Sequence, residues 1–129
     1  MCSKGTFYFT GEKNVKEVVI PYGFTIIGEN AFSLCKTLTN VTIPDSITEI
    51  GKWAFWECSS LANITIPNSV TKICSSAFEG CSSLTNITIP SGITEIGYST
   101  FEYCESLTNI TIPNIVEIIG RHVLFGETI

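Results

Sequence analysis

The sequence has little of what catalysis or nucleic-acid binding requires. It contains a single histidine, His122, and its formal charge of −5 at pH 7 argues against a nucleic-acid-binding surface. We find no serine–histidine–aspartate or cysteine–histidine constellation, no phosphate-binding loop and no metal-ligand spacing. We therefore predict a protein that is not an enzyme and that uses no cofactor and no metal.

Long apolar runs and a leader peptide are also missing. The chain has no run of roughly 18 apolar residues, so we expect no segment that inserts in a membrane. The first residues, MCSKGTFYFTGEKN, lack the apolar centre of a secretory signal. Either the protein stays in the cytoplasm, or a signal has been removed from this chain.

What the sequence does have is an internal repeat. The stretch LTNITIP stands at 84–90 and again at 107–113, with LTNVTIP at 38–44 and LANITIP at 61–67. The register holds without insertion or deletion, so residues 1–129 are predicted to form one domain of about five and a half units. The positions that recur every 23 residues include Pro21, Pro44, Pro67, Pro90 and Pro113; Phe9, Phe32, Phe55, Phe78 and Phe101; and Cys35, Cys58, Cys81 and Cys104.

One unit, residues 38–61, predicts the local structure. Residues 40–43 alternate polar and apolar side chains, which indicates a short strand with one buried face, and Pro44 ends it. A turn and a short extended piece follow. The apolar residues between Ile50 and Leu61 then recur with helical spacing, which predicts one or two helical turns. Such units bury their apolar faces only by stacking, with their strands paired in parallel.

The repeat pattern decays at both ends of the chain. Glu12 and Glu127 stand where the inner units have cysteine, and Leu124 replaces the phenylalanine. Because terminal repeats need a polar outer face, we predict degenerate capping units near residues 1–16 and 114–129.

The stretches AFWECSSLANITIPNSVTKI and AFEGCSSLTNITIPSGITEI resemble the BspA-type leucine-rich repeats. The resemblance extends from Gly5 to about Leu124. It implies a right-handed leucine-rich-repeat superhelix, with short parallel strands on the concave face and short helical turns and extended pieces opposite. It also implies a surface or secreted protein that binds host proteins or other cells.

The four cysteines of the repeat are expected to be buried free thiols. Stacked side chains point the same way about one strand spacing apart, whereas a disulfide needs converging Cβ atoms. A straight column of thiols also cannot surround a zinc ion. Cys74 occupies the place of a recurrent glycine. It is strained if that place needs a positive φ; otherwise the glycines serve close packing.

Two surfaces are candidates for binding a partner. The slots around the predicted helical turns vary between units, whereas the strand face is nearly uniform and offers a specific partner little to recognise. Trp53 and Trp56 lie outside the inward pattern and are expected to share a helical face, unless they lie flat over neighbouring turns. The variable-slot candidates are Trp53, Trp56, Tyr98 and Tyr103, and the alternative strand-face ladder consists of Asn40, Thr42, Asn63, Thr65, Asn86, Thr88, Asn109 and Thr111.

These features predict a non-catalytic module for protein–protein interaction or adhesion. By the family resemblance it binds a host, matrix or cell-surface protein and is located at the cell surface or secreted. Two alternatives remain open: a small self-associating structural module, and a cytosolic recognition protein, which the missing signal and the thiols favour.

Overall fold

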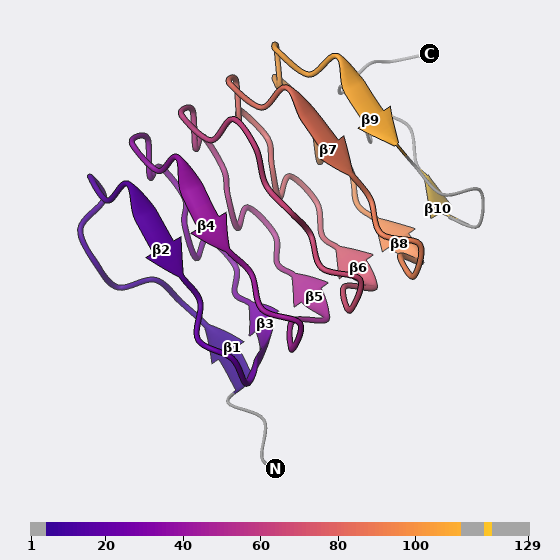
Figure 1. Ribbon diagram of the computed structural model, residues 1–129. Helices are drawn as coiled ribbons and strands as arrows, with labels where there is room; N and C mark the ends of the chain where they lie inside the picture. The colour runs from indigo at the N-terminus through magenta and orange to yellow at the C-terminus, as the bar shows by residue number, and fades with distance from the viewer. Residues whose placement is uncertain (1–4, 112–117, 120–129) are drawn as a thin grey trace.

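The chain winds into a stack of similar coils, described by a computed structural model for residues 5–111 and 118–119 (Figure 1). Every strand pair in this part of the chain is parallel. Successive coils therefore add one layer each, and the predicted solenoid of parallel strands is confirmed.

One face of the stack carries a continuous six-stranded sheet. Its strands come from the extended piece that follows the proline turn, and Ile27, Ile50, Ile73 and Ile96 lie on neighbouring strands in register. All four isoleucines are buried. In sheet order the strands are β1 (Gly5–Phe7), β3 (Phe24–Ile27), β5 (Glu49–Ile50), β6 (Lys72–Ile73), β8 (Glu95–Ile96) and β10 (Ile118–Ile119).

The opposite face, built from the LTNITIP segments, is interrupted. β2 (Glu17–Val19) pairs with β4 (Asn40–Thr42), and β7 (Asn86–Thr88) pairs with β9 (Asn109–Thr111). Residues 63–65, the same segment of the coil between β4 and β7, form no strand (Figure 1).

The interruption coincides with a change in the repeat, where Ala62 replaces threonine. The hydroxyl of Thr39 donates a hydrogen bond to the carbonyl oxygen of Lys16 at 3.1 Å, and Thr108 donates in the same way to Thr85 at 3.4 Å. Alanine has no hydroxyl with which to bind the preceding coil. The coil that lacks this link is the one whose LTNITIP segment does not pair.

A column of phenylalanine rings fills the core between the two faces. Phe32, Phe55, Phe78 and Phe101 are 0% exposed, and successive ring centroids lie 5.1, 5.2 and 5.8 Å apart. The planes of neighbouring rings differ by 7° or less. The ring spacing is close to the roughly 4.8 Å between strands of a sheet, so each ring covers the face of the next one.

The N-terminal end of the column is covered by residues of the predicted capping unit. Phe9 stacks on Phe32 with 5.5 Å between ring centroids. The ammonium group of Lys13 donates to the carbonyl oxygen of Ser33 at 2.6 Å. This oxygen lies in the first full coil, where no preceding repeat supplies a donor. The predicted capping unit at residues 114–129 lies outside the described residues, apart from β10.

The segment from Gly51 to Cys58, predicted as helical turns, is not helical, and no helix occurs in the described part of the chain. Within the coil, the N–H groups of Ala54, Trp56 and Cys58 each donate to the carbonyl three residues earlier. The intervening N–H groups donate to the next coil: Trp53 to Ser75 (3.2 Å), Phe55 to Ala77 (2.8 Å) and Glu57 to Glu79 (2.8 Å). A helix would direct every N–H group beyond its first turn to a carbonyl oxygen within the same helix. The spacing of the apolar residues correctly identifies the side chains that point inward. Tight turns place these side chains inward as well as a helix would, so the spacing alone does not distinguish the two.

These turns place two residues of each coil in the left-handed region. Trp53 has a φ of 59° and Glu57 a φ of 58°. Apart from Gly80, the residues in these two slots carry a Cβ. The equivalent positions in the other coils are Asn30 (60°), Leu34 (64°), Ser76 (59°), Gly80 (80°), Ser99 (54°) and Tyr103 (64°).

In the inner coils the recurrent glycines serve close packing and not a positive φ, whereas Gly5 in the first unit has a φ of 82°. A Cβ on Gly51 would lie 2.6 Å from the carbonyl oxygen of Ile27, and one on Gly97 would collide with the backbone of Ser75. Neither glycine has a left-handed φ, and neither does Cys74 in the equivalent place. The substitution of cysteine at this position therefore carries no left-handed strain.

Replacing Phe78 with alanine is expected to lower the free energy of unfolding by about 3–5 kcal/mol, because it opens a cavity between two stacked rings. Urea denaturation measures this loss. Tyr22→Ala is the control, since Tyr22 is 65% exposed and should change stability by less than about 1 kcal/mol. A loss below about 1 kcal/mol for Phe78→Ala would show that the ring column does not stabilise the stack.

Replacing Ser76 with glycine should raise the free energy of unfolding by about 0.5–1 kcal/mol, because glycine removes the left-handed cost at this position. The neighbouring substitution Ser75→Gly removes no left-handed cost, because Ser75 does not have a positive φ. It should lower the free energy of unfolding by a similar amount, because glycine is more flexible in the unfolded chain. Thermal melts followed by circular dichroism compare the two variants. Equal losses in both would contradict the assignment of strain to residue 76.

Candidate functional site

Two tryptophans on consecutive turns of one coil line a hollow of about 370 Å³ on the turn side of the stack. Trp53 and Trp56 are half-buried, and the other lining residues are Asn30 from the preceding coil and Glu79 from the following coil. Three coils therefore contribute to one hollow. The expected helical face is absent, but the two indoles do share a surface.

The backbone around the tryptophans is fixed from both sides. The N–H of Leu34 donates to the carbonyl oxygen of Trp56 at 2.8 Å, and the hydroxyl of Ser33 donates to that of Trp53 at 2.8 Å. The N–H of Trp53 in turn donates to Ser75 at 3.2 Å. Because these bonds join three coils, the hollow is part of the scaffold.

The side chain of Lys52 lies over one of the indoles. Its Nζ is 4.9 Å from the ring centroid of Trp53, within the range of a cation–π interaction. The other aromatic candidates do not join this arrangement. Tyr98 and Tyr103 are 62% and 61% exposed, lie on a later coil and do not line the hollow.

The strand-face candidates form a less regular ladder than the sequence predicts. All eight asparagines and threonines are exposed. Two hollows of about 270 and 290 Å³ flank residues 63–65, where the strand pairing is interrupted. Asn63 and Thr65 line both, with Thr42 on one side and Thr88 on the other.

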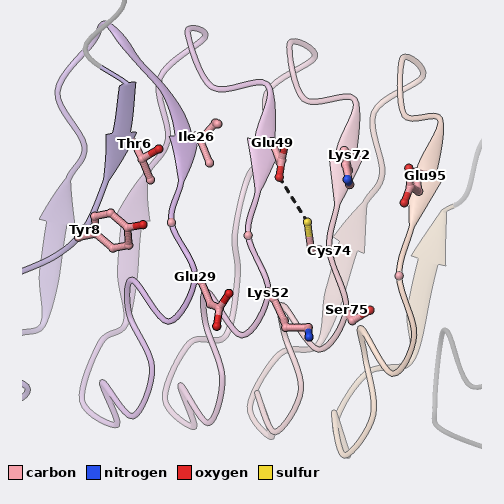
Figure 2. Close-up of a pocket in the computed structure, with 13 residues that line it drawn as sticks. Thr6, Tyr8, Ile26, Glu29, Glu49, Lys52, Lys72, Cys74, Ser75 and Glu95 are labelled. Carbon is pink, nitrogen blue, oxygen red and sulfur yellow. Dashed lines mark hydrogen bonds between the residues drawn. The ribbon is translucent and has the colours of Figure 1, made fainter.

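A third surface, over the six-stranded sheet, was not singled out from the sequence. Figure 2 shows this groove of about 410 Å³, with Glu49, Lys72 and Glu95 projecting from adjacent strands. These three residues are paired in register, so the sign of the charge alternates along the groove. Opposite charges on neighbouring strands stabilise a sheet, which is a sufficient reason for this pattern. The sequence contains a sign of this surface, because Glu49, Lys72 and Glu95 are charged and stand 23 residues apart.

The column cysteines are free and buried, as predicted. Cys58, Cys81 and Cys104 each donate a hydrogen bond to a phenylalanine carbonyl of the preceding coil, with sulfur–oxygen distances of 3.1 to 3.2 Å. Burial raises the pKa of Cys58 and of Cys104 to about 12. Because the thiolate is the reactive form, these thiols have a structural and not a chemical role.

Cys74 is the partly exposed exception. Its sulfur lies 3.5 Å from a carboxylate oxygen of Glu49, to which the thiol donates a hydrogen bond (Figure 2). Burial and the negative charge of Glu49 raise the pKa of Cys74 to about 11. The thiol therefore stays protonated near neutral pH, and Cys74 is not an activated nucleophile.

Residues 5–111 and 118–119 carry neither a metal-binding cluster nor a membrane-spanning helix. No group of three or more histidine, cysteine, aspartate or glutamate side chains in these residues is placed to hold a metal ion. The same residues include no helix with the length and apolar character needed to span a bilayer.

The family model and the solved structures that match this chain both belong to leucine-rich-repeat proteins. The family model for the BspA type leucine rich repeat region matches residues 3–129 in six copies. No curated protein matches the chain.

Similar solved structures are bacterial leucine-rich-repeat proteins. A protein from T. pallidum is 27% identical with a TM-score of 0.73, over 88% of this chain and 64% of that one. One from Bacteroides capillosus is 30% identical with a TM-score of 0.68, over 82% and 84% of the two chains. A leucine rich cell surface protein from Faecalibacterium prausnitzii is 34% identical with a TM-score of 0.65, over 86% and 39%. The chain thus spans less than two thirds of the T. pallidum protein.

Replacing Glu49 with glutamine should lower the pKa of Cys74, because it removes a negative charge and a strong acceptor that favour the thiol. Alkylation of Cys74 by iodoacetamide at pH 8, followed by mass spectrometry, should then run roughly three- to tenfold faster. Glu102→Gln, which changes the same charge elsewhere, should leave the rate unchanged. An unaltered rate in Glu49→Gln would mean that burial alone suppresses this thiol.

Proposed function

Because the chain belongs to the BspA-type leucine-rich repeat family, we propose that it is a non-catalytic module that binds a protein partner. The leucine-rich-repeat proteins of similar structure support a repeat scaffold for protein interaction. The regular stack supplies rigidity, and the side chains that differ between coils supply specificity.

The observation that carries the proposal is the hollow around the two tryptophans. The column of Trp53 holds asparagine or serine in the other coils, and the column of Trp56 holds serine or glutamate. The other coils fold without an aromatic residue at these places, so stacking does not require the indoles. Half-buried aromatic side chains in a hollow are typical anchors of protein interfaces. A unique pair on a repetitive surface can distinguish one partner from another.

Adhesion at the cell surface is the specific form of this function that we propose. The partner is then a host, matrix or cell-surface protein. The similarity to a leucine rich cell surface protein supports the location, and the exposed turn side of the stack is accessible to a large partner. We also propose that residues 1–129 form one solenoid domain. In its N-terminal unit, Phe9 and Lys13 cover the first coil.

Binding to a panel of purified matrix and cell-surface proteins tests the function. Trp53→Ala and Trp56→Ala should each weaken the interaction by roughly 2 kcal/mol or more, the effect of removing an anchor residue. Thr65→Ala and Thr88→Ala, on the strand face, are the matched controls and should bind as the unaltered chain does. Surface plasmon resonance measures affinity, and thermal melts measure the stability of each variant.

Three outcomes would contradict parts of this proposal. If the threonine variants fail to bind while the tryptophan variants bind normally, the strand face is the binding surface. If the tryptophan variants mainly lower the melting temperature, the indoles serve packing. If no panel member binds and light scattering shows a stable oligomer of the chain, self-association is the better function.

A further inference from the structure

Trp53 stands at a position that disfavours a bulky side chain. Its φ is 59°, and the equivalent left-handed positions hold Asn30, Ser76 and Ser99. Asparagine adopts this conformation more readily than most residues, and a bulky residue there is an outlier. The hydrogen bonds to neighbouring coils impose the conformation whichever residue occupies the position. The turn itself therefore does not require an indole at this position.

The hollow beside Trp53 has the chemistry of a site for a positive charge. Two indole rings line it, and an indole face carries the negative end of its quadrupole. Glu79, whose side chain carries a negative charge, lines the same hollow. No lysine or arginine lines the hollow.

The chain itself already places a cation on one of these rings. The Nζ of Lys52 lies 4.9 Å from the ring centroid of Trp53, yet Lys52 is not part of the hollow. The indole of Trp53 therefore attracts an ammonium group in the free protein, and no cationic side chain lines the hollow itself.

We propose that this hollow takes an arginine or lysine side chain of the protein partner, held between the indoles of Trp53 and Trp56 and paired with the carboxylate of Glu79. This rests on the interaction function proposed above and specifies the partner: a protein with a basic contact surface. The net charge of −5 favours the approach of such a surface over a long range.

A neutral sugar is the competing occupant, because sugars also stack on indole rings. A sugar needs several hydrogen-bonding groups at once, and the hollow offers the side chains of Asn30 and Glu79. The amide oxygen of Asn30 lies 2.6 Å from the hydroxyl of Ser33, which shares its one proton between Asn30 and the carbonyl oxygen of Trp53. One carboxylate beside two rings suits a cation better than a polyhydroxylated ring.

Tryptophan fluorescence tests the occupant directly, since the chain has two tryptophans and both lie at the site. The probe is N-acetyl-arginine amide, and the matched control is N-acetyl-citrulline amide, which has a similar shape without the charge. We expect a saturable change with the arginine compound, with a Kd on the order of 10 mM for one cation–π contact and one ion pair. Citrulline should bind at least roughly fivefold more weakly. Saturation with methyl glucoside but not with the arginine compound would overturn the proposal in favour of a sugar.

Charge variants separate the contributions while keeping the reporter. Glu79→Gln should weaken binding of the arginine compound roughly threefold or more, because it removes the paired carboxylate. Glu17→Gln removes the same charge from β2 on the strand face and should leave the affinity unchanged. Trp56→Ala should weaken binding further, with Trp53 remaining as the fluorescent reporter. Equal affinities for Glu79→Gln and Glu17→Gln would contradict the ion pair.

The two proposals fail in different ways. If the panel protein needs Trp53 and Trp56 but the arginine compound produces no saturable change, the cationic occupant is wrong and the interaction function stands. If the arginine compound binds as expected but no protein's affinity depends on the tryptophans, the occupant stands and the function assigned to this surface is wrong.

Discussion

The structure depends on backbone hydrogen bonds from each coil to the next. On the turn side every second N–H leaves its own coil, as the bond from Phe55 to Ala77 at 2.8 Å illustrates. On the sheet side the N–H of Gly51 donates to Ile27 at 2.8 Å. A buried backbone group without a partner costs about as much as a lost hydrogen bond, so this pairing fixes the conformation of every coil. The left-handed residues of the turns, and the absence of helix from the described residues, both follow from it.

The side chains of the repeat then serve this pairing. Glycine at position 51 lets two backbones approach closely, since a Cβ would meet the carbonyl oxygen of Ile27. The thiol of Cys81 gives the carbonyl of Phe55 a second donor. The rings of Phe55 and Phe78 stack at 5.2 Å, near the spacing that the hydrogen bonds set. The 23-residue repeat therefore reflects the regular backbone hydrogen bonds between coils, and the buried columns of side chains follow from that regularity.

The surface is less constrained, and this is where the chain departs from its own repeat. Trp56 lacks the hydroxyl that Ser33, in the same column, donates to the next coil, but it keeps the backbone hydrogen bond between coils, because its carbonyl oxygen still accepts from Leu34. The tryptophans, Glu79 and Lys52 can therefore be chosen for binding while the scaffold stays the same. The charged column over the six-stranded sheet also varies between coils. There the variation places opposite charges on neighbouring strands, which stabilises the sheet.

The sequence by itself determined the period, the inward columns of phenylalanine and cysteine, and the family. It did so because equal spacing reports which residues occupy equal environments. It also marked Trp53 and Trp56 as exceptions to the pattern. Only the tertiary structure decided that turns replace the expected helix, that residues 63–65 form no strand, and that Asn30 and Glu79 join the tryptophans in one hollow. The physical reason is that the partner of a given N–H on the turn side lies a whole coil further along the chain, outside any local pattern.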